Sequence, residues 1–249
     1  MIIIKSEREI ELMKKAGRVV ALVFEGIKDK IVPGISTQDV ADMCEKIIRD
    51  EGAYPTFLNY SGYPGAVCVS VNDELVHGIP SKRRILRDGD IVSVDVGATL
   101  NGYVGDACRT YPVGICSTNA LRLIKVTEES FFEGVKHARP GARLGDISHA
   151  IQEYCEKNGY SLPREYTGHG IGSSLHEDPY IPNYGSAGTG PVLKEGMCLA
   201  IEPMVAEGHF AIRVLKDGWT AKMKDGKLSS HYENSIVITK DGYEILTKI

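Results

Sequence analysis

Two acidic residues end apolar runs that are typical of buried strands. Asp95 closes the run "IVSVD" and Glu202 closes the run "MCLAIE". Because burying an unpaired carboxylate costs free energy, each of these residues needs a cationic partner or a metal ion. A buried salt bridge or a helix N-cap stays open as the alternative for either residue taken alone.

A predicted hairpin brings a third carboxylate close to Asp95. Asn101-Gly102 is a strong two-residue turn signal, and such a turn pairs Gly97 with Asp106. Asp95 then becomes a diagonal neighbour of Asp106 on one face, at about 7–8 Å between Cα atoms. Two carboxylates at that distance repel each other unless a cation lies between them. A one-residue change in loop length would place them on opposite faces.

Two histidines lie seven residues apart in the glycine-rich stretch "YTGHGIGSSLHEDP", residues 166–179. The glycines on either side of His169 allow close backbone approach. The stretch has no Lys and does not match G-x-G-x-x-G, which argues against a phosphate loop, and "HEDPY" is not the zinc motif H-E-x-x-H. His77 shares the "HGI" of His169. The remaining histidines are expected at the surface or in a satisfied core: His137, His149, His209 and His231.

The elements that must position these residues follow from capping and periodicity. Ser6 and Glu9 form a capping box ahead of a long helical pattern that Pro33-Gly34 breaks. Residues 37–50 predict a second helix. Two more helical patterns follow Asn119, separated by Pro140-Gly141, and residues 90–97 predict a buried strand.

The two halves of the chain share matching residues at a constant offset of 107 positions. The same offset also superposes Asp95 on Glu202. We therefore expect a single catalytic α/β domain over residues 1–249, built from pseudo-repeats of about 1–115 and 116–249. The matched residues are Pro33, Gly34, Asp39 and Gly52 with Pro140, Gly141, Asp146 and Gly159.

Composition narrows the class of protein. The net charge of −4 gives no support for nucleic-acid binding, and the longest apolar stretch, "VVALVF", is too short to span a membrane. The N-terminus turns charged at once and does not read as a signal peptide. Six scattered cysteines without a C-x-x-C motif fit buried thiols in a reducing compartment, so we expect a cytoplasmic protein.

The chain resembles the methionine aminopeptidase and prolidase superfamily, whose five metal ligands match in order and spacing. Residues 166–184 resemble the signature of type I methionine aminopeptidases, and residues 59–80, 89–97, 200–204 and 216–220 extend the resemblance over nearly the whole chain. Without an N-terminal zinc-finger extension, the chain resembles the short bacterial form. The matching ligands are Asp95, Asp106, His169, Glu202 and Glu233, the last of which the strand pattern alone does not single out.

The resemblance implies the pita-bread fold, an antiparallel sheet with helices outside and an internal pseudo-twofold axis. It implies removal of the N-terminal methionine from nascent proteins whose second residue is small. Two divalent ions (Co, Mn, Fe or Zn) would hold a hydroxide that attacks the first peptide bond. Glu202 would also act as general base, His176 would stabilise the oxyanion, and His77 would contact the scissile amide or the peptide backbone.

The resemblance also implies two further sites. The methionine side chain would lie against Tyr60, Tyr63, Cys68 and Trp219, and one Na⁺ or K⁺ would bind at Asn72, Glu74 and Ser229. The expected partners are nascent chains and the ribosome, with no nucleic-acid or membrane binding, and the expected state is a monomer. His176 is expected to work with His77 rather than with His169.

The chain departs from the family pattern at Gly97, where Thr is common, and at Ala107 and Leu175. Two other functions stay open. A proline-specific aminopeptidase or dipeptidase of the same fold carries the same five ligands, usually behind a long N-terminal domain. A catalytically inactive binding module would typically have lost ligands.

Overall fold

The computed structural model describes residues 1–249 and contains four α-helices. Ser6 caps the first with the predicted capping box, in which its side chain accepts from Glu9 N while the Glu9 carboxylate accepts from Ser6 N. The helices are α1 (Glu7–Ile27), α2 (Thr37–Asp50), α3 (Thr118–Val135) and α4 (Leu144–Lys157). All four were predicted from the sequence.

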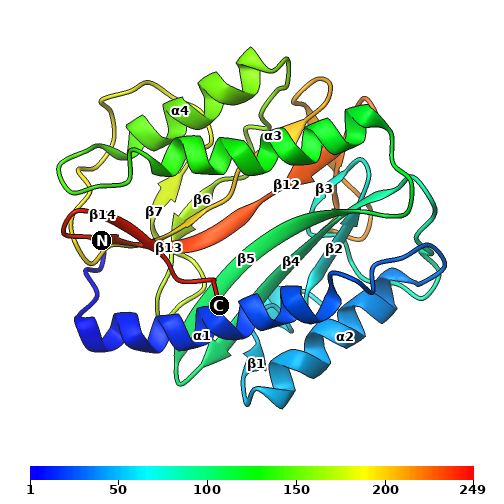
Figure 1. Ribbon diagram of the computed structural model, residues 1–249, viewed down its shortest axis with the longest axis horizontal. Coiled ribbons are helices and arrows are strands. Elements are labelled where there is room, and N and C mark those ends of the chain that lie inside the picture. Colours follow the sequence, from blue (N-terminus) through cyan, green and yellow to red (C-terminus); the bar gives the residue numbers. More distant parts are fainter.

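Nine strands form one antiparallel sheet, in the order β1-β4-β5-β13-β8-β6-β7, with β2 beside β4 and β14 beside β13 (Figure 1). The centre is formed by β5, β13 and β8, so segments far apart in sequence meet there. The strands are β1 (Tyr54–Pro55), β2 (Cys68–Val71), β4 (Ile91–Leu100), β5 (Tyr103–Pro112), β6 (Gly168–Gly170), β7 (Glu177–Ile181), β8 (Cys198–Ile201), β13 (Glu233–Thr239) and β14 (Gly242–Ile245).

Two small sheets and a short helix complete the fold. One sheet has the order β10-β11-β3 and the other pairs β12 with β9. Residues 54–67, expected as a loop, contain β1 and a 3₁₀ turn at Tyr60–Gly62. The small-sheet strands are β3 (Glu74–Val76), β9 (Met204–Ala206), β10 (Ile212–Val214), β11 (Ala221–Met223) and β12 (Ser229–His231).

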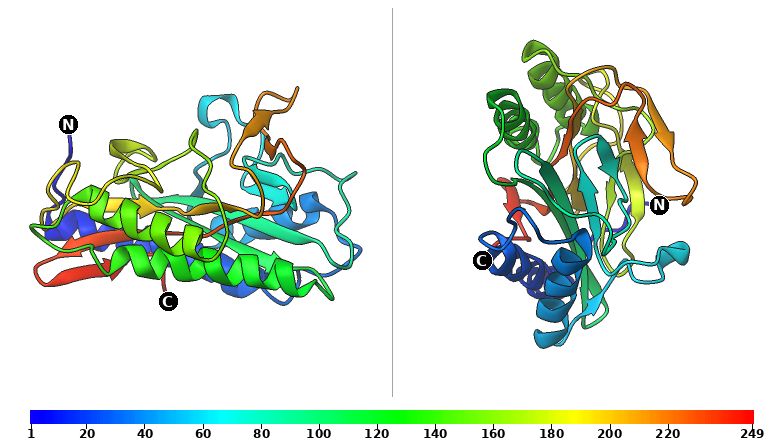
Figure 2. Two further views of the ribbon diagram at one scale, coloured as in Figure 1. Left: turned by 90° about the horizontal axis from the view of Figure 1, so that it is seen from above. Right: turned by 90° about the vertical axis from the view of Figure 1, so that its right-hand side faces the viewer.

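All four helices cover one face of the large sheet, and the loops and small sheets gather on the other (Figure 2). One core cluster lies between the sheet and α3 and α4, and another lies between the sheet and α1 and α2. The helix face is thus the main apolar interior. The opposite face of the sheet is left for the site.

The offset of 107 residues recurs in the backbone hydrogen bonds. Gly34 N donates to Leu86 O, and Gly141 N donates to Leu193 O. The two donors are 107 residues apart, and so are the two acceptors. Asp39 and Asp146 accept the equivalent capping bonds at the starts of α2 and α4. The repeat in the sequence therefore corresponds to a repeat in the local hydrogen bonds.

No helix of the structure is both long enough and apolar enough to cross a lipid bilayer.

Helix α1 packs on β5 with almost no space between the two backbones. A Cβ atom on Gly105 would lie 2.6 Å from Gly17 Cα and 2.8 Å from the carbonyl carbon of Ala16. Because backbone atoms cannot move aside like the end of a flexible side chain, only glycine fits at position 105 without displacing α1.

We expect Gly105→Ala to lower the free energy of unfolding by about 1–3 kcal/mol, because it overpacks this contact. Urea denaturation measures the change. Gly242→Ala is the matched control, since a Cβ there meets nothing within 4 Å and should change stability by less than about 0.5 kcal/mol. Equal stabilities of the two variants would contradict the close packing of α1 on β5.

Candidate metal centre and substrate pocket

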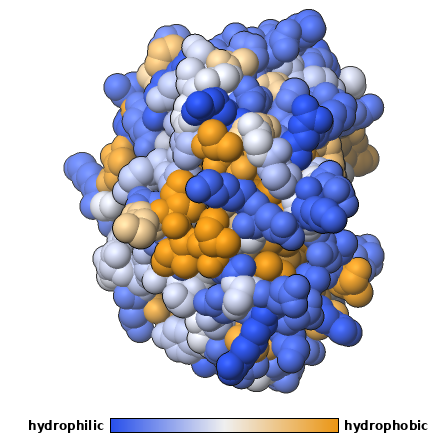
Figure 3. All heavy atoms as spheres, turned by 90° about the vertical axis from the view of Figure 1, so that its left-hand side faces the viewer, coloured by the Kyte–Doolittle hydropathy of each residue, from blue (hydrophilic) through white to orange (hydrophobic).

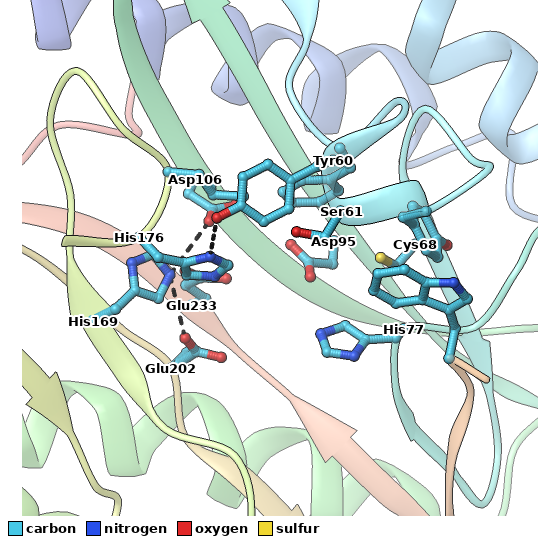
Figure 4. Close-up of a pocket in the computed structure, with 14 residues that line it drawn as sticks. Tyr60, Ser61, Cys68, His77, Asp95, Asp106, His169, His176, Glu202 and Glu233 are labelled. Carbon is cyan, nitrogen blue, oxygen red and sulfur yellow. Dashed lines mark hydrogen bonds and ion pairs between the residues drawn. The ribbon is translucent and has the colours of Figure 1, made fainter. Parts of the chain in front are cut away.

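The five predicted metal ligands converge on one pocket (Figure 4). Four of them lie on different strands of the large sheet, and the fifth directly follows another strand of that sheet. The β4–β5 hairpin has the predicted register, with Gly97 paired to Asp106. The ligands are Asp95 on β4, Asp106 on β5, His169 on β6, Glu202 directly after β8 and Glu233 at the start of β13.

The carboxylates in this pocket lack partners for some of their oxygens. Asp95 Oδ1, Asp106 Oδ1 and Glu233 Oε1 are buried and accept no hydrogen bond. Burial raises the pKa of Asp95 to about 7 and raises the pKa of Glu202 well above its ordinary value. Burial, followed by repulsion from neighbouring carboxylates, raises the pKa values of Asp106 and Glu233. A bound cation would satisfy these oxygens and offset the repulsion.

The tautomer of His169 points to the same conclusion. Its Nδ1 lies 2.9 Å from the carbonyl oxygen of Gly170. Because a carbonyl only accepts hydrogen bonds, Nδ1 carries the proton and Nε2 presents a lone pair. That Nε2 lies 3.7 Å from Asp106 Oδ2 and 3.6 Å from Glu202 Oε1, two further acceptors. An unprotonated ring nitrogen next to carboxylate oxygens fits a metal ligand, and a fixed Nδ1–H is typical of a ligating histidine.

The site contains two overlapping groups of donors whose ligand atoms lie within 4.8 Å of one another. One comprises Asp106, His169 and Glu233, and the other comprises Glu202, His231 and Glu233. Glu233 belongs to both groups. Oxygen donors with one or two imidazoles suit first-row divalent metals better than a sulfur-preferring ion.

The prediction that His231 is a surface or satisfied core residue was wrong. The residue is 2% exposed, and its Nε2 has no hydrogen-bond partner. That atom lies 3.5 Å from Glu202 Oε2 and 3.9 Å from Glu233 Oε2. Burial lowers the pKa of His231 to about 4, so the ring is neutral at physiological pH. The signal was its position two residues before Glu233, since alternate residues of an extended segment share a face. The other three histidines expected to be structural are exposed: His137, His149 and His209.

His169 and His176 lie at opposite ends of the loop that joins β6 to β7. Their rings meet edge to face, with centroids 4.3 Å apart. His176 Nδ1 lies 2.8 Å from the Tyr60 hydroxyl, and burial lowers the pKa of this histidine. The direct neighbours of His176 are thus His169 and Tyr60, and its joint action with His77 stays a prediction.

His77 lines the pocket on another side (Figure 4). It follows β3 with a left-handed backbone, at φ 59°, and its ring packs edge to face on Tyr166 at 5.2 Å. Burial lowers the pKa of His77 to about 4, so this ring is also neutral near pH 7. His77 and His176 can thus each donate a hydrogen bond while the ring is uncharged.

The residues expected to hold the methionine side chain line the same pocket. Tyr63 donates its hydroxyl hydrogen to Gly78 O at 2.9 Å, which leaves its ring against Trp219 at 5.2 Å between centroids. Cys68 is buried beside Asp95 in the β2–β4 ladder. Phe57 also lines the pocket and was missed, although it lies three residues before Tyr60.

The three departures from the family pattern have separate structural settings. A Cβ on Gly97 would lie 2.6 Å from the Phe57 ring, so the absent side chain makes room for that ring. Leu175 lines the pocket. Ala107 is buried in the core cluster beneath α1 and α2, on the helix side of the sheet, away from the metal ligands.

Asn72 and Ser229, two of the residues expected at a monovalent-cation site, are in contact. Ser229 N donates to Asn72 O at 2.9 Å, and the Ser229 hydroxyl lies 3.2 Å from the same oxygen. The Glu74 carboxylate accepts a hydrogen bond from Val71 N at 2.8 Å. These contacts place the three residues around one turn.

The raised pKa of Asp95 gives the metal-free protein a defined dependence of stability on pH. The folded state keeps a proton up to about pH 7 that the unfolded chain releases near its ordinary pKa of 3.8. The buried histidines, with pKa values lowered from 6.5, act in the opposite sense only below pH 6.5. We therefore expect the free energy of unfolding to fall between about pH 6.5 and 8, by about 1.4 kcal/mol per pH unit for each proton still held.

Urea unfolding of chelator-treated protein at several pH values measures this slope. Asp95→Asn should make the slope shallower, and saturating Mn²⁺ should remove it. A metal-free stability that rises across this interval would show that the carboxylates do not carry the excess protons.

Comparisons with known proteins agree with this site. Residues 11–240 match the model of metallopeptidase family M24. Methionine aminopeptidase 1 from Bacillus subtilis is 53% identical over 249 residues, which cover 100% of this chain and 100% of the relative. The crystal structure of a methionine aminopeptidase from Thermotoga maritima is 50% identical with a TM-score of 0.99, again over 100% of both chains.

More distant structures share the architecture. A prolidase from Pyrococcus furiosus is 26% identical with a TM-score of 0.80, and the match covers 99% of this chain and 66% of the prolidase. The predicted pita-bread fold is thus confirmed. The family match, the 53% identity over the full length, the TM-score of 0.99 and the pocket of unpartnered carboxylates all support one assignment. The chain therefore belongs to metallopeptidase family M24, among the type I methionine aminopeptidases.

Proposed function

We propose that this protein hydrolyses the first peptide bond of chains that begin with methionine and have a small second residue. The observation that carries the proposal is the buried cluster of Asp106, His169 and Glu233, whose ligand atoms lie within 4.8 Å of one another. These ligand atoms line a pocket that also has apolar and aromatic walls.

We infer that two divalent cations, Co, Mn, Fe or Zn, bind at Asp95, Asp106, His169, Glu202 and Glu233. Four carboxylates carry four negative charges, which two divalent ions would neutralise. When bound, such ions supply Lewis acidity and lower the pKa of a coordinated water. One Na⁺ or K⁺ at Asn72, Glu74 and Ser229 is part of the same proposal.

Glu202 is placed to take and return a proton during the reaction. Its backbone oxygen accepts a hydrogen bond from Asn183 Nδ2 at 2.9 Å, which fixes the chain where β8 ends. Its side chain is 12% exposed, so one oxygen can reach the pocket. His231 Nε2 lies 3.5 Å from the other carboxylate oxygen, Glu202 Oε2.

His176 is placed to donate a hydrogen bond to an oxygen that gains charge. If the Tyr60 hydroxyl donates to His176 Nδ1, the neutral ring carries its proton on Nε2. A donor held before the reaction begins stabilises an oxyanion more than solvent does. His77, on the other side of the pocket, would contact the scissile amide or the peptide backbone.

The apolar wall would accept the methionine side chain. Tyr60, Tyr63, Cys68 and Trp219 were expected there, and Phe57 and Leu175 join them along the lining. Aromatic rings and a thiol suit a thioether, because sulfur makes favourable contacts with ring edges.

We further propose one catalytic domain built from two halves, about 1–115 and 116–249, that works as a cytoplasmic monomer on nascent chains near the ribosome. The repeated hydrogen bonds at Gly34 and Gly141 support the two halves. The arrangement explains why Asp95 and Glu202, one from each half, both face the site.

Peptide hydrolysis tests the reaction directly. We expect the Mn²⁺-loaded protein to release methionine from Met-Ala-Ser, to lose this activity after chelation, and to regain it when Mn²⁺ is restored. Met-Pro-Ala and Gly-Pro are the comparison substrates. Hydrolysis that requires proline and leaves Met-Ala-Ser intact would overturn the proposal in favour of a proline-specific peptidase, and metal-free protein from a metal-rich preparation would favour a binding module.

Single variants separate the histidine roles from metal binding. We expect His176→Ala to lower kcat by about 100- to 1,000-fold, as loss of an oxyanion donor does. His77→Ala should also lower turnover, and both variants should keep the metal content of the unmodified protein by native mass spectrometry. His169→Ala is the contrasting variant, since it should lose metal. Loss of metal from His176→Ala would make that residue a ligand instead.

A further inference from the structure

The N-terminal segment reverses the usual placement of apolar and charged side chains. Ile3 and Ile4 are 48% and 47% exposed, whereas the Lys5 side chain is only 3% exposed. Figure 3, which faces the end of the molecule that carries the N-terminus, shows apolar side chains gathered on this surface. Lysine is almost never fully buried unless it is paired. A specific partner must therefore hold Lys5 inside.

That partner is Glu177, the residue that directly follows His176. Lys5 Nζ lies 2.6 Å from Glu177 Oε2, and the Glu177 side chain is 7% exposed. The other oxygen, Oε1, accepts a hydrogen bond from Ser174 N at 3.3 Å. The ion pair thus joins the N-terminal segment to both ends of the short stretch that carries His176.

The loop is shaped around this pair. A Cβ on Gly172 would lie 2.5 Å from Glu177 Oε1 and 2.6 Å from Lys5 Cε, so a side chain at position 172 would displace the ion pair. Lys5 is itself anchored, because its backbone N donates to Gly196 O at 2.8 Å. Ile4 bridges to Met197, which is followed by β8.

Other contacts also reach this loop: Gly172 O accepts a hydrogen bond from Val104 N at 2.9 Å, Leu175 is buried, and the His176 ring meets Tyr60 and His169. The ion pair is the contact that ties Glu177, the neighbour of His176, to the N-terminal segment. A buried ion pair stabilises a fold little more than apolar side chains of similar size would, so its main effect is to fix geometry. We propose that Lys5, acting through Glu177, is a positioning residue for His176; this inference rests on the proposed role of His176 in hydrolysis.

Lys5→Met tests this inference in the full-length, Mn²⁺-loaded protein. We expect kcat for Met-Ala-Ser to fall by about tenfold or more, because a small misplacement of a catalytic group is costly. KM and metal content should stay close to those of the unmodified protein, since no ligand or pocket wall is changed. Hydrogen exchange of residues 172–177 should become faster, while that of β8 stays the same.

Two further variants keep the inference falsifiable. Lys14→Met is the matched control, because Lys14 on α1 pairs with Glu244 at 3.1 Å, is 34% exposed and does not line the pocket; it should leave kcat unchanged. Lys5→Met/Glu177→Met removes the unpaired buried carboxylate, so it should recover stability but not kcat. Unchanged kcat in Lys5→Met, or full recovery of kcat in the double variant, would overturn the inference.

The exchange measurement needs no substrate, so it separates this inference from the proposed function. If the unmodified protein fails to cleave Met-Ala-Ser, the proposed function fails. If residues 172–177 exchange equally fast with and without Lys5, the positioning role fails even when the unmodified protein is fully active.

Discussion

The fold must hold four mutually repelling carboxylates together in one buried pocket. Asp95, Asp106, Glu202 and Glu233 cannot all be charged there without a cation, and their raised pKa values express that cost. A flexible scaffold would let such groups separate. The sheet prevents this, because each carboxylate sits on a strand, or directly after one, within a continuous hydrogen-bonded ladder.

The helices serve the same constraint from the other face. All four pack on one side of the sheet, and at Gly105 the backbone of α1 nearly touches β5. Apolar burial is thereby concentrated on the helix side, where the two large core clusters lie. The other face is left to hold polar groups whose partners are a metal ion and a substrate. Stability and reactivity are thus assigned to opposite faces of one sheet.

The two histidines of "YTGHGIGSSLHEDP" show how one hairpin can give neighbouring residues different chemistry. His169 lies on β6, donates Nδ1–H to a backbone carbonyl and presents a lone pair to the carboxylates. His176 lies at the far end of the loop, and its Nδ1 meets a tyrosine hydroxyl instead. Their rings touch, yet the local hydrogen bond leaves a lone pair on His169 Nε2, which suits a metal ion. If the Tyr60 hydroxyl donates to His176 Nδ1, the proton of His176 lies on Nε2, which suits a hydrogen-bond donor.

Local patterns in the sequence were sufficient for much of this. The Asn101-Gly102 turn and the flanking strands define the hairpin register that brings Asp95 and Asp106 to one face, because turn type and side-chain alternation act over a few residues. The Ser6–Glu9 capping box, the Pro-Gly breaks and helical periodicity predicted the four helices for the same reason. Glu233 emerged only by resemblance, since the alternation around it is not clean.

Contacts between distant segments were decided by the tertiary structure alone. His231 was misjudged because its significance comes from the approach of Glu202, which β8 supplies through its pairing with β13. Phe57 enters the pocket because Gly97, on the neighbouring strand β4, leaves it room. The Lys5–Glu177 pair joins residues 172 positions apart. Local sequence patterns establish which residues could do chemistry and how each short element forms. Which of these residues meet depends on packing over the whole chain, and no local propensity encodes it.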